Sequence, residues 1–576
     1  MRHFFPFLEW LPRYKRSYLK SDLLAGLTVA IVLIPQGMAY ALVAGLPAVY
    51  GLYASLVPVL MYALLGTSRG LGVGPVAMDS LLVAAGLGAI ATIGPDNYIA
   101  MAILLAFMVG CIQLILGLLR MGFLVNFLSK PVISGFTSGA ALIIMCSQLK
   151  YLMGTEIERS NQLHSMLVNT IQKVGDTNLY DLAIGIAGIL LMVLFKKWNR
   201  KIPYILLVVA LSILVVYYFD LSSLGVQIVG DIPAGLPSFS VPQIEIDILA
   251  QLWPIALTLA LIGYLEAISI GKSIEDKNNE DRIDPNQELV SLGMANITGS
   301  FFQSYPVTAS FSRSAIYNEA RSKTNLATII TVLIVLGTIL FLTPLFYFLP
   351  KAALASIIMV SVYGLIDVAY AKTLWKYRRD EFLVLLITFF ITLFIGIMPG
   401  ILVGVLISLL LMVYRTSNPH FAELGKIKNT KYYKNIKRFG SEALVRDDVL
   451  IIRFDAQLYF GNANYFRTEL FKLMGHKGPK LEAVILNAEA INYIDSTAAN
   501  MLLRVIEKLY DKGIHFFIAG AIGPTRDILF TSGIMEVLPK ECLFVETKEA
   551  VAFFDDPQRR SQMKSVVAYQ RNKVGN

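Results

Sequence analysis

The sequence predicts an α-helical polytopic membrane protein that ends in a small α/β domain. The chain has 576 residues, of which 56% are hydrophobic and only 16% are charged. Its mean hydropathy is +0.61, so it carries more apolar surface than a soluble core can bury. Long apolar segments follow one another to about residue 415, and shorter β-type and helical runs alternate after it. We therefore expect five regions: an interfacial N-terminus 1–22, a transmembrane domain 23–416, a basic linker that also starts the last domain 417–440, the α/β domain 441–560 and a tail 561–576.

The apolar segments are long enough, some with a proline break, to form two sets of seven spans. Before them, Trp10 and Tyr14 are typical anchors of a helix that lies in the membrane interface. The fourteen predicted spans are 23–42, 49–66, 72–90, 97–118, 131–149, 181–195, 203–219, 249–270, 286–302, 305–317, 324–348, 352–368, 381–397 and 400–415.

The charge distribution predicts the topology. The formal charge is +9, which also suits nucleic-acid binding, but Lys and Arg gather in alternate loops, and the loop 220–248 has none. This asymmetry follows the positive-inside rule, with both termini in the cytoplasm. We therefore expect no nucleic-acid partner, and the start of the chain, which has no targeting pattern, suits a bacterial inner membrane.

Two of the spans begin irregularly. The third opens RGLGVGPVAMDSLLV and the tenth opens SYPVTASFSRSAI. Pro75 suits a first helical position and Ser310 suits an N-cap. Because the breaks fall at matching places in the two halves, they indicate an inverted-repeat secondary transporter whose half-helices meet near the bilayer midplane. The extended residues before the two half-helices would then pair with each other. The alternative is that Pro and Gly kink two ordinary spans.

Two opposed helix N-termini favour an anion, because each offers unpaired N–H groups and about half a positive charge. Arg313, beside Ser312 in the first turn after Ser310, would strengthen that field. A guanidinium inside the membrane costs at least about 2.5 kcal/mol, so a functional role is favoured. The alternative, compatible role is an ion pair with Glu266 or Asp79.

Several motifs resemble the SulP sulfate permeases, in family order: LIPQGMAYALVAGLPAVYGLYAS, GVGPVAM, YLEAISIGKS, ASFSRSAIYNEARSKTNLA, and LYFGNANYF followed by INYIDSTAA. The last pair is similar to a STAS domain, so the resemblance covers nearly the whole chain. It implies core and gate domains that move in an elevator-like fashion, in a homodimer. By motif it places the anion among Gln36, Tyr40, Val76, Ala77, Phe311, Ser312 and Arg313, with Ser310 as the adjoining cap.

Glu266 is the candidate for coupling. Moving a divalent anion inward against 100 mV costs about 4.6 kcal/mol, so uptake needs cotransported cations or exchange. Glu266 lies inside the eighth span, where burial favours its protonated form, and the resemblance to the proton-coupled plant members favours proton coupling over sodium. The alternative is that Glu266 only neutralises Arg313. The role of Asp79 is open, because the plant members usually have an apolar residue there.

Other functional classes find less support. No nucleophile–base pair, metal cluster or cofactor motif is present in the sequence, so we expect no enzyme, no metal and no cofactor. Sulfate is the favoured substrate, and bicarbonate, dicarboxylates and halides stay open, as do a passive anion channel and a membrane anchor for a regulatory STAS domain. In that domain Asp495 and Ser496 suit an N-cap. Ser496 is also a possible phosphorylation site, which would imply a cytoplasmic partner.

Overall fold

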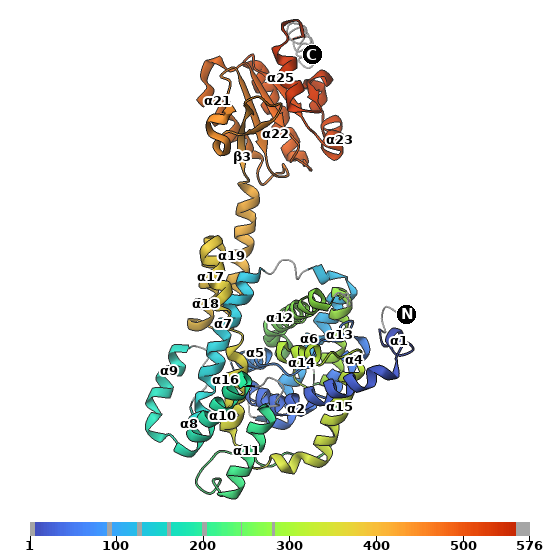
Figure 1. Ribbon diagram of the computed structural model, residues 1–576, viewed down its shortest axis with the longest axis vertical. Helices are drawn as coiled ribbons and strands as arrows, with labels where there is room; N and C mark the ends of the chain where they lie inside the picture. Colours follow the sequence, from blue (N-terminus) through green and yellow to red (C-terminus); the bar gives the residue numbers. More distant parts are fainter. Residues whose placement is uncertain are drawn as a thin grey trace. The chain divides into compact units, whose positions relative to one another are not determined.

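The computed structural model describes residues 6–88, 95–123, 129–157, 163–198, 204–243, 245–278 and 283–559. The chain divides into two compact units, Met1–Ser408 and Leu409–Asn576. The expected tail 561–576 lies outside the described residues. Figure 1 shows the first unit as a set of helices and the second as a sheet with helices around it.

Helices occupy every predicted span. Within the described residues, eight helical stretches are long and apolar enough to cross a membrane, and three apolar helices are shorter. The bounds are α2 Leu19–Ala44, α3 Ala48–Tyr53, α4 Val57–Leu65, α5 Ala77–Gly88, α6 Pro95–Leu118, α7 Lys130–Ser147, α10 Leu179–Trp198, α11 Tyr204–Tyr218, α12 Ile246–Asn278, α13 Pro285–Ser300, α14 Phe311–Glu319, α15 Leu326–Gly337, α16 Lys351–Tyr363, α18 Arg379–Phe394 and α19 Ile397–Ser417.

Short helices lie between these spans. They are α1 Phe7–Trp10, which lies in the predicted interfacial region, α8 Leu149–Met153, α9 Leu163–Gln172 and α17 Val368–Tyr377. Neither α9 nor α17 was expected from the sequence, because both are too short and too polar to resemble a span.

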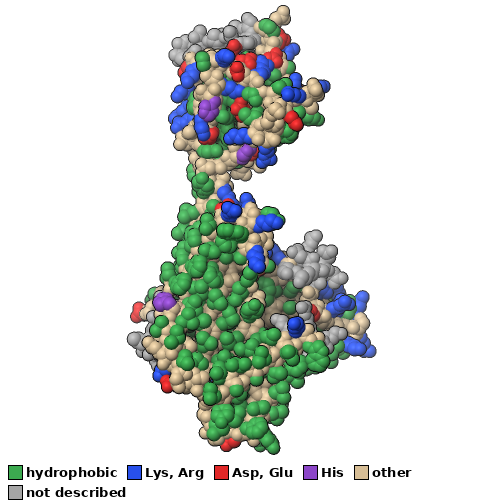
Figure 2. All heavy atoms as spheres, turned by 60° about the vertical axis from the view of Figure 1, so that its left-hand side comes forward, with side chains coloured by type: hydrophobic (Ala, Val, Ile, Leu, Met, Phe, Trp, Pro, Cys, Tyr) green, Lys and Arg blue, Asp and Glu red, His purple; other side chains and the backbone are tan. Residues whose placement is uncertain are grey.

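The long helices pack in two groups. In one group α2 to α6 contact α12 to α15, and in the other α7, α10 and α11 contact α16 and α18. This grouping matches the expected core and gate domains. Large hydrophobic side chains remain exposed along α10, α11 and α18, and Figure 2 shows hydrophobic side chains covering most of one face of this unit. An apolar surface of this extent suits contact with lipid rather than water.

Glycine allows the closest helix crossings. In α2 and α3, a Cβ added to Gly37 would lie 3.0 Å from the Gly51 carbonyl oxygen. In α6 and α13, a Cβ added to Gly110 would lie 2.7 Å from the Gly293 carbonyl oxygen. Small residues at such crossings are typical of helix packing in membranes, where backbone approach replaces the hydrophobic effect as the source of attraction.

The second unit is built on a mixed sheet with the strand order β4-β3-β6-β7-β8-β9, and β5 (Ala443–Leu444) pairs with β3. The strands β6 (Val449–Phe454), β7 (Ala483–Asn487), β8 (His515–Ala519) and β9 (Leu543–Phe544) are parallel. The helices α21 (Ala463–Lys477), α22 (Ser496–Asp511) and α25 (Thr547–Asp555) contact these strands. The two strands before them, β3 (Phe421–Ile427) and β4 (Tyr433–Asn435), lie in the stretch expected to hold the basic linker. That stretch therefore contributes two strands to the sheet.

Candidate functional site between two half-helices

The two irregular span openings pair with each other, as the sequence predicts. The strand β1 (Val73–Gly74) lies antiparallel to β2 (Thr308–Ala309), with Val73 opposite Ala309. The pairing continues beyond the strands, because Ser310 N donates to the Gly72 carbonyl at 2.9 Å. Gly72 N in turn donates to Ser314 Oγ at 2.8 Å. These bonds satisfy backbone groups that lipid could not satisfy.

Both half-helices begin directly after the paired strands. The helix α5 starts at Ala77 and α14 starts at Phe311, so their unpaired N–H groups lie beside the same short ribbon. Gly74 has φ +143°, a conformation that side-chain-bearing residues rarely adopt. This glycine lets the chain leave the strand and enter the half-helix within three residues.

One detail of the expected helix starts was wrong and the other was confirmed in position. Pro75 does not occupy the first helical position, because α5 begins two residues later. Ser310 does hold the N-cap position, but its side chain makes no capping hydrogen bond. Its hydroxyl lies 3.1 Å from the Ser312 hydroxyl instead. The Ser310 side chain therefore does not cap the first amides of α14.

Arg313 joins the two half-helices. Its side chain is 0% exposed, and Nη1 donates to the Pro75 carbonyl at 2.8 Å. Neither Nε nor Nη2 has a hydrogen-bond partner among the described residues. Buried guanidinium groups are almost always fully paired, so two unused donors beside two helix N-termini indicate a place for a negatively charged ligand.

The expected ion pair of Arg313 with Glu266 or Asp79 is not formed. Glu266 interacts electrostatically with Arg313, but the guanidinium makes no hydrogen bond to either carboxylate among the described residues. Within the described part of the chain, Glu266 Oε2 and Asp79 Oδ1 are buried without a hydrogen-bond partner. Arg313 is therefore not engaged in a structural salt bridge with either of these carboxylates.

The other residues predicted to bind the anion lie around Arg313. Gln36 and Tyr40 lie one turn apart on α2, which contacts both α5 and α14. Tyr40 interacts electrostatically with Arg313, and Gln36 Oε1 is a further buried atom without a partner. Val76 and Ala77 are also buried and lie where α5 begins.

The first turn of α14 has both exposed and buried side chains. Phe311 is 46% exposed and Ser312 is exposed too, whereas Arg313 behind them is fully buried. The predicted residues therefore form two layers, with exposed side chains in front of a buried cation.

Sequence reasoning missed the residues that hold the ribbon in place. Asn296 on α13 accepts a hydrogen bond from Val307 N at 2.8 Å and donates to the Val307 carbonyl at 3.1 Å. Thr308 Oγ1 donates to the Gly263 carbonyl on α12 at 2.7 Å. The available signal was the amide Asn296 inside the predicted span 286–302.

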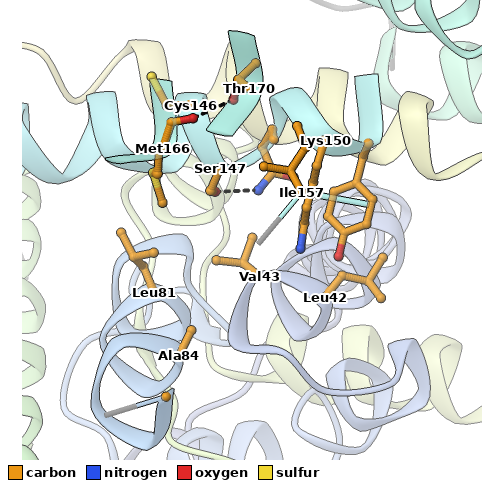
Figure 3. A pocket seen from close by; sticks show the side chains of 13 residues that line it. Leu42, Val43, Leu81, Ala84, Cys146, Ser147, Lys150, Ile157, Met166 and Thr170 are labelled. Atoms are coloured by element: carbon orange, nitrogen blue, oxygen red, sulfur yellow. Dashed lines mark hydrogen bonds between the residues drawn. The ribbon is translucent and has the colours of Figure 1, made fainter. Parts of the chain in front are cut away.

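A cavity of about 180 Å³ lies away from these residues. Figure 3 shows Leu81 and Ala84 of α5 on one side of it, and Cys146, Met166 and Thr170 of α7 and α9 on the other. None of the predicted anion-binding residues lines this cavity. It marks loose packing between the two groups of helices.

Comparison with known proteins agrees with this arrangement. Residues 19–388 match the family model described as the sulfate permease family, and residues 441–550 match the STAS domain. The chain belongs to the sulfate permease family. Within this family it is 39% identical to the probable sulfate transporter 4.2 of Arabidopsis thaliana, over 95% of this chain and 83% of the relative. It is 38% identical to the chloroplastic sulfate transporter 4.1 of the same plant, over 95% and 82%.

Solved structures show the same fold for this sulfate permease family member. The murine solute carrier 26 family member A9 anion transporter, in its inward-facing state, aligns with a TM-score of 0.88 at 27% identity, over 96% of this chain and 94% of that one. The transmembrane domain of a cyanobacterial bicarbonate transporter, BicA, aligns with a TM-score of 0.59 at 23% identity, over 69% and 98%. The protein is thus an integral membrane protein with a helical transporter fold and a STAS domain.

Proposed function

We propose that this protein is a secondary active transporter that takes up sulfate together with protons. The anion binds between the N-termini of α5 and α14, beside the Arg313 guanidinium. The observation that carries the proposal is this buried arginine, with two unused donors at the junction of two half-helices. Relatives that are 31 to 39% identical are named as sulfate transporters, which supports sulfate as the anion.

Glu266 carries a proton in this proposal. Its Oε2 atom is buried and has no hydrogen-bond partner in the described part of the chain, and its charge interacts with Arg313. An ionised carboxylate near the guanidinium competes with the anion for the positive field, whereas a protonated one does not. Proton binding and anion binding therefore favour each other, and uptake follows the pH gradient.

The movement we propose is of the elevator type. The two groups of helices meet along the cavity between α2 and α5 on one side and α7 to α9 on the other. Loosely packed contacts lose little dispersion energy when they slide. The half-helix group would carry the bound anion across the membrane, and the other group would hold its position in a homodimer.

The test is uptake of labelled sulfate into proteoliposomes that contain the purified full-length protein. We expect an inward pH gradient to drive accumulation, and Glu266→Gln to lower it about tenfold per pH unit, because one proton is worth a factor of ten per unit. Glu319→Gln, which changes an exposed glutamate at the end of α14, is the matched control and keeps the accumulation of the unmodified protein.

Other outcomes decide between the alternatives. Larger uptake of bicarbonate, succinate or chloride than of sulfate would assign that anion, rather than sulfate, as the substrate. Full pH-driven accumulation by the Glu266→Gln protein would assign the proton to another group. Sulfate uptake that only runs down its own gradient would favour a passive channel, and no anion uptake at all would favour a membrane anchor for the STAS domain.

The cellular setting is also a proposal. We propose that both termini lie in the cytoplasm, where Ser496, exposed at the start of α22, is open to phosphorylation and to a STAS-binding partner. The relatives named above are plant proteins and give no support to the bacterial inner membrane that the sequence suggested. That placement stays a prediction, and fractionation of the source cells tests it.

A further inference from the structure

Asp79 is a second acidic side chain at the candidate site, and the proposed function leaves it without a role. It lies in the first turn of α5 and is 2% exposed. Its Oδ1 atom has no hydrogen-bond partner among the described residues. An ionised carboxylate that is buried with an unused oxygen is costly. A protonated carboxyl needs no compensating charge.

The surroundings of Asp79 place it beside Glu266. A Cβ added to Gly263, one helical turn before Glu266 on α12, would lie 3.5 Å from Asp79 Oδ2. The two carboxyl groups interact electrostatically. Two like charges near each other in a buried site disfavour double ionisation.

The other charged and titratable groups near Asp79 are few. Arg313, Tyr305 and Tyr40 face the same region from β2 with its flanking residues and from α2. The helices α6 and α7 also pack against α5. Their charged or titratable residues are Asp96, Tyr98 and Lys130, which lie at the helix starts, and Cys111 and Cys146 further along. The charge state of the site is therefore set mainly by one arginine and two carboxyl groups.

The charges balance a divalent anion only when both carboxyl groups are protonated. Arg313 contributes one positive charge, and the two helix N-termini together contribute about one more. With Asp79 and Glu266 ionised, the sum is near zero and the site has no net attraction for sulfate. With both protonated, the sum is about +2, which matches the charge of sulfate.

Asp79 also lies at the positive N-terminal end of α5, where the anion is proposed to bind. A carboxylate in the first turn of a helix satisfies the positive helix N-terminus. While Asp79 is ionised it therefore competes with the anion for the start of α5, and its protonation releases that helix end to the anion.

We propose that Asp79 is a second proton-carrying residue, so that each sulfate is taken up with two protons. The inference rests on the proposed proton-coupled uptake and adds its stoichiometry. Because two protons cancel the charge of sulfate, transport moves no net charge.

The experiment measures sulfate accumulation in proteoliposomes with the full-length protein and the membrane potential held at zero. For each unit of pH gradient, two protons give about 100-fold accumulation and one proton gives about tenfold. We expect about 100-fold for the unmodified protein and about tenfold for Asp79→Asn. An inside-negative potential of about 60 mV should lower accumulation about tenfold only in the variant, because only the variant moves a net negative charge.

The matched control is Asp181→Asn. Asp181 on α10 is also fully buried with one unpartnered oxygen, but it is not among the groups that interact electrostatically with Arg313. It should keep the 100-fold accumulation and the insensitivity to potential.

Several results would overturn the inference. About tenfold accumulation by the unmodified protein excludes a second proton, whether or not the variant folds. An Asp79→Asn protein that still accumulates sulfate 100-fold without sensitivity to potential removes Asp79 from the coupling. Accumulation that follows an imposed sodium gradient would show that a sodium ion, rather than a second proton, is cotransported. By contrast, sulfate uptake by the unmodified protein that ignores the pH gradient contradicts the proposed function itself.

Discussion

Arg313 shows how a single residue can be costly for the fold and still be kept. Its guanidinium is fully buried, yet among the residues that the structure describes only Nη1 finds a partner, the Pro75 carbonyl. Two unused donors in a buried group raise the free energy of the folded protein. A bound anion would accept hydrogen bonds from those donors. The free energy that the unpaired donors cost the folded protein is then recovered on binding and contributes to affinity for the substrate.

Replacement of Arg313 is therefore expected to act on substrate affinity. Hydrogen bonds to charged groups contribute about 1.5 to 3 kcal/mol each, so Arg313→Gln should raise the sulfate concentration needed for half-maximal uptake at least about tenfold. Arg313→Lys keeps the charge but not the forked geometry. Its half-maximal sulfate concentration should therefore lie between those of the unmodified protein and of Arg313→Gln. The measurement is the concentration dependence of sulfate uptake at fixed pH.

The control for this substitution is Arg321→Gln, at an exposed arginine just after α14. It should leave the half-maximal concentration unchanged. Equal effects of the two substitutions would mean that general positive charge, rather than the Arg313 site, attracts the anion.

Asp455 provides a residue-scale prediction for the second unit. Burial raises the pKa of its carboxyl, but hydrogen bonds and positive charge from Arg453 and His420 outweigh burial, so the net pKa is lowered. A lowered pKa in the folded state contributes stability above the ordinary value of about 4, and this contribution is lost as the pH falls through the folded pKa.

The unfolding midpoint of the second unit should therefore decrease as the pH falls below about 4. Asp455→Asn should flatten that decrease, because the substituted amide does not titrate. Circular dichroism of the full-length protein across this pH range measures it. A variant as acid-sensitive as the unmodified protein would assign the loss of stability to other carboxyl groups.

At the scale of elements, the transmembrane unit depends on backbone contacts that only glycine permits. The crossing of α6 and α13 brings Gly110 and Gly293 together, and a Cβ added to Gly293 would lie 2.6 Å from Leu114 N. No flexible side chain can move aside there, since the facing atoms belong to the backbone. Because α13 also carries Asn296, which holds the residue before β2, this crossing positions the candidate site.

Gly110→Ala should therefore destabilise the protein by about 1 to 3 kcal/mol, the usual cost of overpacking. Gly337→Ala at the end of α15 is the control, because an added Cβ meets nothing within 4 Å there, and alanine favours the helix. Thermal unfolding in detergent compares the two. A Gly110→Ala protein as stable as the control would show that the crossing relaxes easily.

At the scale of the whole molecule, the described residues form two large hydrophobic cores and three small clusters. One large core is formed by the long helices, and the other by the sheet and helices of the second unit. The second core depends in part on the start of α22, where Asp495 accepts hydrogen bonds from Ala498 N and Phe460 N, both at 2.8 Å. Each unit should therefore respond to its own substitutions.

Asp495→Ala tests this independence. Loss of an N-cap costs about 1 to 2 kcal/mol, so the unfolding transition of the second unit should shift to lower temperature while that of the transmembrane unit stays in place. Differential scanning calorimetry of the full-length protein in detergent resolves the two. A shift of both transitions by the same amount would show that the units unfold together.

The sequence by itself determined the spans, the two interrupted helices and the α/β domain. It also singled out Arg313 and Glu266, because charge is rare inside apolar segments and therefore stands out. Span length, hydropathy and helix breaks are local properties, so they can be read from neighbouring residues. The pairing of β1 with β2 joins distant segments, but it could still be predicted, because both interrupted spans leave backbone groups that lipid cannot satisfy.

Only the tertiary structure decided which side chains meet. Pro75 lies outside its helix and accepts a bond from Arg313, 238 positions away, and the Ser310 hydroxyl turns to Ser312 rather than to the backbone. The proximity of Asp79 to Glu266 and the hold of Asn296 on Val307 likewise depend on how helices from both halves cross. Sequence patterns carry no information on such distances, because packing between distant segments sets them.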